Sequence, residues 1–468
     1  MIIKIPQINV LDIIIVGLSC YEGILCIANF CDASASVNHI LYICNYILIA
    51  TIIISLIKKG ISEHFIPISF FTCFLVFLMG QKPFERYYNV YLTFVRVELN
   101  TSQYAIFAAI LFFGISITYI SYILFYYNSK KNINDSINST SFLPIKPLIQ
   151  TLFWITLPCA LYMQLKIVIV RGMMTYTEGY LVNVDVPSLI KVGYYIFSGI
   201  ILIYFAMKPS KKEVYMLCFF YLLIEGGMQI FQGRRALLAS TLLFIMWYLF
   251  KYYGIKKINM EYLFRIIMIT IGMIILFYII EQVRSGSNSN ELSLELFKNF
   301  FISTGGSDSV IANTIVRSDK FPQKGWMYLF DPFINNPIRN FILKIESFPQ
   351  GISYIKAHNS FPDWISYLTD AQLYITGHGM GSCYLAEVYL AFGLGGIIAV
   401  SIILGKVLQI LNGVSLQENV YRTAFMFYVV KNLFTLPRSG LFSWVGNLPY
   451  LLFVFMMIYP FYVRYCRK

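Results

Sequence analysis

Long apolar runs alternate with short polar segments along almost the whole chain. A run of about 20 apolar residues crosses the roughly 30 Å hydrocarbon layer of a bilayer as a helix. On that criterion the pattern predicts about twelve spans, near residues 8–30, 39–57, 65–79, 104–126, 148–170, 189–206, 214–231, 236–252, 262–280, 384–411, 421–436 and 442–463. The expected fold class is an all-α polytopic membrane protein.

The spans divide the chain into three predicted units. Residues 1–281 form a transmembrane domain with spans 1 to 9, residues 282–382 form one long segment outside the membrane, and residues 383–468 add spans 10 to 12. The long segment combines aromatic stretches such as "GWMYLFDPF" with turn signals such as "STGGSD". Its patches of helical periodicity predict a lid of helical segments over the membrane domain.

Composition narrows the class of protein further. Of the 468 residues, 58% are hydrophobic and 13% are charged, whereas water-soluble domains carry about 25% charged residues. The formal net charge is +13, but the basic residues are scattered through short loops, which argues against a nucleic-acid partner. The nine cysteines lie mostly within apolar runs and lack the spacing of metal ligands or of a disulfide framework.

Lysines indicate the orientation in the membrane. The segments "LIKKGI", "NSKKN", "KPSKKE" and "YGIKK" all follow even-numbered spans, and "RYCRK" follows the last span. Short basic loops stay in the cytoplasm, so both termini are expected there, with membrane lipid around the spans.

Lysine dominates the predicted inward segments, whereas arginine is prominent in the predicted outward ones. Arginine binds phosphate or carboxylate with two parallel hydrogen bonds, which lysine does poorly. We therefore predict an outward-facing anion clamp; the structural alternative is arginines that bind lipid headgroups. The clamp residues are Arg234, Arg235, Arg284 and Arg438.

A glycine-rich segment, "GHGMGSCYLAEVYLAFGLGG", runs directly into span 10. Glycines let backbone amides approach a ligand, and these precede a helix N-terminus, which attracts anions. Ser382 is expected to cap that helix, and the later glycines, Gly393, Gly395 and Gly396, to admit a neighbouring helix. The predicted substrate loop consists of Gly377, His378, Gly379, Gly381 and Ser382.

Two residues are the main candidates for a general base. His358 lies in "KAHNSFPDWISYL", and histidine titrates near neutral pH; Asp363 and Asp370 are further titratable groups of the lid that could act as a base. Glu387 lies five residues after Ser382, about one and a half helical turns below the predicted membrane surface. Each has a structural alternative, because titratable groups in loops and at helix starts also serve as ordinary hydrogen-bond partners.

These motifs resemble those of a known family. The turn "GRRALLASTLL", the long outward segment and the glycine-rich segment together are similar to the O-antigen polysaccharide polymerases of the Wzy type, over about the C-terminal half of the chain. The resemblance implies a metal-independent glycosyltransferase of the GT-C membrane class, without a cofactor, in the bacterial cytoplasmic (inner) membrane.

The resemblance also implies a substrate and partners. The enzyme would join undecaprenyl-diphosphate-linked oligosaccharide repeat units into a surface polysaccharide (an O-antigen, capsule or exopolysaccharide), beside a chain-length regulator and a flippase. His358 and Glu387 would be catalytic and the four arginines would hold the diphosphate. A lipid-linked polysaccharide ligase shares all these features. A flippase or transporter predicts charges deep within several spans instead, together with duplicated halves.

Overall fold

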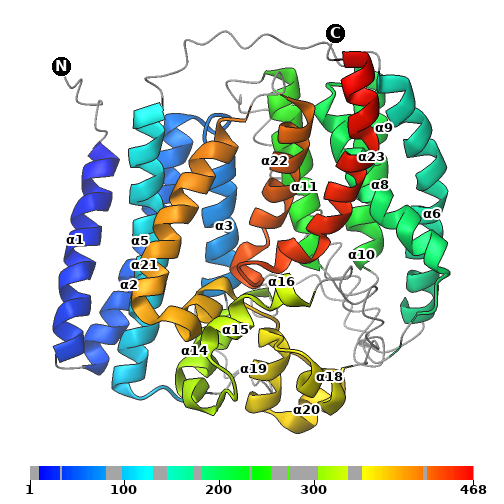
Figure 1. Ribbon diagram of the computed structural model, residues 1–468. Coiled ribbons are helices and arrows are strands. Elements are labelled where there is room, and N and C mark those ends of the chain that lie inside the picture. The colour runs from blue at the N-terminus through cyan, green and yellow to red at the C-terminus, as the bar shows by residue number, and fades with distance from the viewer. Residues whose placement is uncertain are drawn as a thin grey trace.

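Every element in the part of the chain that the computed structural model describes is helical. The structure describes residues 10–31, 34–80, 97–129, 145–172, 182, 184–230, 235–254, 272, 304–335, 350–414 and 419–466. Long helices run side by side as a bundle, and a group of short helices covers one end of it (Figure 1). The all-α polytopic architecture is thereby confirmed.

Most of the predicted spans coincide with helices of the bundle. Among the described residues, eight helices are long and apolar enough to cross a membrane, and they match spans 1, 2, 4, 5, 6, 8, 10 and 12. They are α1 (Val10–Cys31), α2 (Ala35–Gly60), α5 (Thr101–Ser129), α6 (Lys146–Gly172), α8 (Ser188–Ala206), α11 (Arg235–Tyr253), α21 (Tyr384–Asn412) and α23 (Leu448–Cys466), the last preceded by η6 (Ser443–Asn447).

The remaining spans differ from this pattern. Spans 3 and 11 are the shorter helices α3 (Phe65–Met79) and α22 (Val420–Leu433). Span 7 is divided into α9 (Lys211–Tyr221), the π-helical segment η3 (Leu222–Gly227) and α10 (Met228–Ile230). Span 9 lies outside the described residues, so the total of twelve stays a prediction.

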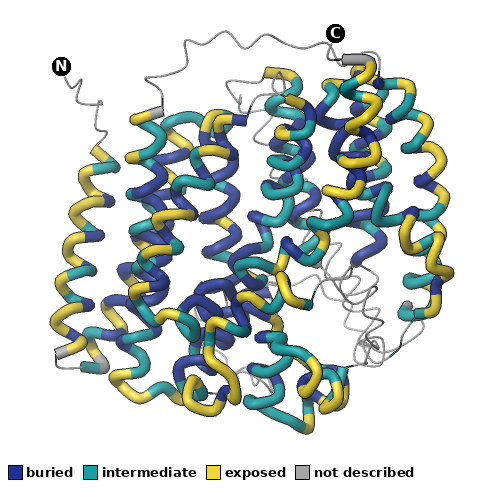
Figure 2. The backbone as a smooth tube through the Cα atoms, viewed as in Figure 1, coloured by how far each residue is buried: buried dark blue, intermediate teal, exposed yellow. Residues whose placement is uncertain are grey.

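Helix α3 lies inside the bundle and is buried along most of its length (Figure 2). The outer helices instead expose apolar side chains; on α1, Ile13, Ile24 and Ile27 are 61%, 67% and 68% exposed. Contiguous exposed apolar surface is costly in water, so these faces are the ones that contact lipid.

Helix α21 packs most closely on α5, but not through the glycines predicted for that role. A Cβ built on Gly405 would lie 2.7 Å from the carbonyl oxygen of Thr118 in α5. Gly395, in contrast, has open space around it, and Gly393 takes a non-helical conformation with φ +62°. Gly393 therefore kinks α21, because a left-handed conformation interrupts the helical ladder and favours glycine.

The described part of the long segment between predicted spans 9 and 10 forms short helices over one end of the bundle, which we call the lid; its location outside the membrane stays a prediction. Its described elements are α14 (Asp308–Arg317), η4 (Ser318–Lys320), α15 (Gly325–Leu329), α16 (Asp331–Ile334), α18 (Ile352–Ala357), α19 (Phe361–Thr369) and α20 (Ala371–Ile375). Ser307 N–H donates to the carbonyl of Phe77 in α3 at 3.2 Å. A Cβ on Gly325 would overlap the main chain of Leu390 in α21. The lid is thus joined to the bundle by direct backbone contact.

One ion pair lies inside the membrane domain. Lys431 Nζ of α22 contacts Glu225 Oε2 of η3 at 2.6 Å, and Ser198 Oγ of α8 donates to Glu225 Oε1 at 2.7 Å. Thr241 Oγ1 donates to the Glu225 carbonyl at 3.4 Å, which supplies a partner within the irregular turn. Glu225 therefore joins three helices and the π-helical segment, because a charge in this environment needs a partner.

We expect Lys431→Met to destabilise the protein by about 3–5 kcal/mol, because it leaves the Glu225 carboxylate buried without its counter-charge. Thermal unfolding of the purified protein in detergent measures the loss. Lys58→Met, at an exposed lysine of α2, is the matched control and should melt as the wild type does. The double change Glu225→Gln with Lys431→Met should recover part of the loss. Equal melting of the Lys431 variant and the wild type would contradict this role.

Candidate active site

Glu387 occupies the first turn of α21, and its side chain is buried at 6% exposure. Its Oε1 accepts a hydrogen bond from Ser382 Oγ at 2.6 Å. Its Oε2 accepts one from the main-chain N–H of Leu441 at 2.9 Å. One carboxylate thus joins the glycine-rich loop, the start of α21 and residues 436–442, which we call the Arg438 loop.

Gly440 provides the space for this carboxylate. A Cβ built on Gly440 would overlap both carboxylate oxygens of Glu387. Glycine is needed at position 440 because the Glu387 side chain comes this close to the main chain, whatever the backbone conformation there. The sequence shows Gly440 only as part of a Pro/Gly break, so its fit to Glu387 was not predicted.

The glycine-rich loop is held by hydrogen bonds to α19 and α21. Gly377 and Gly381 have φ of +94° and +77°, a region that favours glycine. The Met380 N–H donates to Ser366 Oγ of α19 at 2.9 Å. The prediction that Ser382 caps span 10 is wrong: the N-cap of α21 is Cys383, and the Ser382 hydroxyl donates to Glu387 instead.

His378 is part of the connection between this loop and the lid. Its Nδ1 lies 3.1 Å from Thr376 Oγ1, and its carbonyl accepts a hydrogen bond from Gln350 Nε2 at 2.7 Å. The same Gln350 amide donates to the carbonyl of Tyr374 at 2.9 Å. These contacts fix the path of the backbone, while Gly379 beside His378 is exposed.

The predicted arginines are described in part. Arg438 is exposed and ends η5 (Leu436–Arg438), so the structure brings its loop against Glu387 through Gly440 and Leu441. Arg235 is the first residue of α11. Arg234 and Arg284 lie outside the described residues.

His358 lies at the end of α18 in the lid. Its ring stacks on Tyr354 with centroids 4.4 Å apart, and its Nδ1 is 3.1 Å from the Tyr354 carbonyl oxygen. The carboxyl groups of Asp331 and Asp363 are close enough to His358 for its charge to affect their pKa. Burial raises the pKa of both carboxyls, and the positive charge that His358 can carry opposes this rise.

Each lid acid has a defined environment. Asp363 accepts hydrogen bonds from Ser360 Oγ and, at 2.9 Å, from Tyr374 OH. Asp331 begins α16 and accepts the Asn359 N–H at 3.2 Å. Asp370 serves a different purpose, because it caps α20 by accepting the Leu373 N–H at 3.0 Å. Asp331 was missed from the sequence, although the "DP" pair in "GWMYLFDPF" is a helix-start signal.

Short helix α16 connects the lid acids with the Arg438 loop. Phe330 and Phe333, on either side of Asp331, pack on Phe442 with ring centroids 5.4 Å and 5.1 Å apart. The charge of Asp331 also acts on Glu387. The predicted candidates His358, Glu387 and Arg438 therefore belong to one connected region where the lid meets the membrane domain.

Comparison with known families decides what kind of protein has this arrangement. The family model described as O-antigen polysaccharide polymerase Wzy matches residues 12–468. The chain belongs to this family. No curated protein and no solved structure matches the chain.

Membership of the Wzy family gives the region a chemical meaning. Polymerisation of repeat units is a glycosyl transfer, which requires a base for a hydroxyl and positive charge for a leaving group. The region presents an imidazole, buried carboxyls and an exposed guanidinium. Among the described residues, no group of three or more His, Cys, Asp or Glu residues has the arrangement to hold a metal ion.

We expect Gly440→Ala to displace the Glu387 carboxylate and lower polymer yield at least about tenfold. Loss of one charge-assisted bond costs about 1.5–3 kcal/mol, and about 1.4 kcal/mol corresponds to a factor of ten. Gly446→Ala in η6 is the matched control, because open space surrounds that glycine. Gel analysis of polymer from cells with equal protein levels measures the effect. Equal polymer in the two variants would contradict the assigned function of Gly440.

Proposed function

We propose that this Wzy-family protein polymerises oligosaccharide repeat units linked to undecaprenyl diphosphate, at the outer face of the bacterial cytoplasmic membrane. The observation that carries the proposal is the place where the lid contacts the bundle: the Arg438 loop binds Glu387 through Leu441 and packs on Phe330 of the lid, next to Asp331, which binds the main chain beside His358. The product is a surface polysaccharide, with O-antigen favoured by the family and capsule or exopolysaccharide as variants of the same chemistry. A chain-length regulator and a flippase are the proposed partners.

The arrangement of charge along the chain supports the proposed outer face. The lid covers one end of the bundle, whereas α1 begins and α23 ends at the opposite end (Figure 1). The lysine pairs in the last turn of α2 and at the start of α9 belong to that opposite end, which supports a cytoplasmic location for it. Substrate that has crossed the membrane then meets the lid side.

The proposed reaction is a single displacement of diphosphate at an anomeric carbon. The acceptor is the sugar end of a new lipid-linked repeat unit, and its hydroxyl gives its proton to His358 Nε2. The hydroxyl oxygen forms a bond with the anomeric carbon of the donor chain. The bond from that carbon to the diphosphate oxygen breaks, and the diphosphate leaves with the electron pair and an added negative charge.

Arg438 is proposed to stabilise the departing diphosphate, together with Arg234, Arg235 and Arg284. A guanidinium forms two parallel hydrogen bonds to phosphate oxygens and needs no proton transfer to do so. The departing group is already activated, so the proposal includes neither nucleotide sugar nor metal ion. Positioning, a base and positive charge are sufficient for this chemistry.

The structure favours different functions for the two predicted catalytic residues. Both oxygens of Glu387 already accept hydrogen bonds from Ser382 and Leu441 within the protein. We therefore assign Glu387 as a positioning residue that fixes the Arg438 loop. His358 uses Nδ1 toward the Tyr354 carbonyl, an arrangement that leaves Nε2 as the nitrogen for proton transfer.

We expect the purified protein to build polymer from undecaprenyl-diphosphate-linked repeat units in the presence of EDTA and without nucleotide sugar. His358→Ala should lower kcat by about a hundredfold or more, the usual contribution of a general base. Tyr354→Phe is the matched control, because it keeps the ring that stacks on His358. Chain length on gels and the rate of repeat-unit consumption are the measurements.

Glu387 variants separate positioning from proton transfer. Glu387→Gln keeps the shape of the side chain and two polar atoms at its end. If Glu387 is a positioning residue, Glu387→Gln should therefore keep more activity than Glu387→Ala. A base should lose activity equally in both variants. The proposed reaction would be contradicted if the wild-type protein made no polymer, or if elongation of the polymer required a divalent metal ion.

A further inference from the structure

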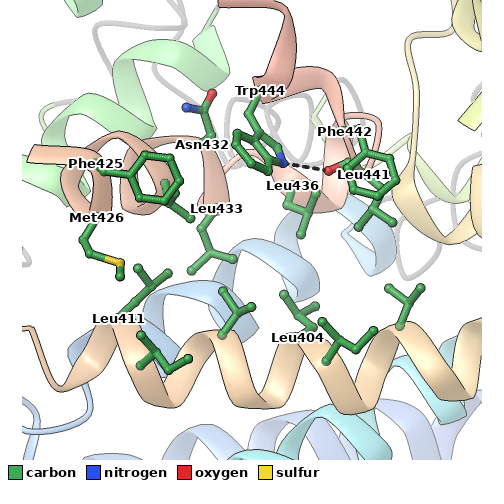
Figure 3. Close-up of a pocket in the computed structure, with 15 residues that line it drawn as sticks. Leu404, Leu411, Phe425, Met426, Asn432, Leu433, Leu436, Leu441, Phe442 and Trp444 are labelled. Carbon is green, nitrogen blue, oxygen red and sulfur yellow. Dashed lines mark hydrogen bonds between the residues drawn. The ribbon is translucent and has the colours of Figure 1, made fainter. Parts of the chain in front are cut away.

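An apolar groove opens on the membrane domain beside the Arg438 loop. It has a volume of about 410 Å³ and lies between α21, α22 and residues 436–444. Leu404 and Leu411 of α21 face Phe425, Met426 and Leu433 of α22 across it, and Leu441, Phe442 and Trp444 lie at one end (Figure 3). Ile403 on its wall is 61% exposed, so the groove opens toward the surrounding lipid.

The groove lining offers apolar contacts almost throughout. The polar side chains in it are those of Asn432 and Trp444. Asn432 Nδ2 donates to the carbonyl of Tyr428 at 2.8 Å, and Trp444 Nε1 donates to the carbonyl of Leu441 at 3.1 Å. Because these N–H groups have partners within the protein, the lining is suited to a hydrocarbon chain.

The groove is continuous with the candidate active site. Leu441 lines the groove with its side chain, while its main-chain N–H donates to Glu387. Leu436 also lines it, and Arg438 follows two residues later in the same short helix. Phe442, a third lining residue, packs on Phe330 of the lid. A hydrocarbon chain bound in the groove would therefore have one end close to Arg438 and to the lid.

We propose that this groove binds the isoprenoid tail of the lipid-linked substrate and holds its diphosphate beside Arg438. The inference rests on the proposed function. A substrate with an apolar tail and an anionic head needs both surfaces in continuity, and α21 with the Arg438 loop supplies them. The tail enters sideways from the bilayer past Ile403.

The test compares two substrates that carry the same repeat unit, one on a long polyprenyl diphosphate and one on a chain of two isoprene units. The wild-type protein in nanodiscs should show a lower KM for the long tail. Val407→Trp and Met426→Trp fill the groove, and we expect each to reduce this preference about tenfold, because several buried methylenes lose their contacts. Ile402→Trp is the matched control on α21; Ile402 is 43% exposed and does not line the groove.

Arg438→Ala tests the binding of the diphosphate head separately from the binding of the tail. It should raise KM for both substrates by a similar factor and leave the ratio between them unchanged. An unchanged preference in both groove variants, or an equal loss of preference in Ile402→Trp, would overturn the inference even when polymerisation itself is confirmed.

A labelling experiment tests the groove independently of activity. A polyprenyl diphosphate with a photoreactive group in its tail should label α21 and α22 at groove residues in the wild-type protein, with labelling reduced in Val407→Trp. Unlabelled polyprenyl diphosphate should compete, whereas added phospholipid should not. Labelling elsewhere, or equal competition by phospholipid, would overturn the assignment. If the groove is labelled but no polymer forms, the proposed function fails and the binding site stands.

Discussion

The contact of Glu387 with the Arg438 loop is the constraint on which the arrangement of the site depends. A buried carboxylate must have its hydrogen bonds satisfied by the protein, and Glu387 achieves this through Ser382 and the main chain of Leu441. The cost of leaving either oxygen without a partner holds the glycine-rich loop and the Arg438 loop at the start of α21. The arginine, one end of the apolar groove and the Phe442 contact with the lid are all placed by this one side chain.

The same requirement explains the irregular parts of the bundle. Glu225 lies in a π-helical segment and is paired with Lys431, which fixes α22 against α8. The groove uses the face of α22 that carries Met426 and Leu433. The Lys431–Glu225 ion pair therefore holds one side of helix α22, and another side of the helix lines the apolar groove. Short or broken helices are tolerated here because protein, not lipid, surrounds their polar groups.

The sequence predicted the fold well where the signal is local. Runs of apolar residues identify α1, α2 and α5, since span length follows directly from bilayer thickness. The π-helical segment of span 7 was not predicted, because its Glu225 meets partners on other helices, Lys431 and Ser198. Kinking at Gly393 and close packing at Gly405 also depend on neighbours. A glycine in the sequence does not indicate which of these functions it has.

The candidate site was predicted in the same uneven way. His358, Glu387 and Arg438 were chosen from residue type and from their predicted side of the membrane, and their functions stay predictions. Gly440 and Asp331 were missed, because their importance comes from contacts between segments far apart in the chain. The capping function expected for Ser382 was wrong for the same reason, since Glu387 competes for its hydroxyl. Residue type in the sequence indicates candidate site residues, whereas contacts between distant segments determine what each of them can do.

The most direct test of the central claim is the number of undecaprenyl diphosphate molecules released for each repeat unit that enters the polymer. Purified protein and isotopically labelled lipid-linked repeat units are sufficient for the measurement. The account predicts one released molecule for every new glycosidic linkage. Release of one molecule for each finished chain would indicate a ligase, and movement of the lipid-linked sugar without release would indicate a flippase. Either result would contradict the assignment of this site to polymerisation.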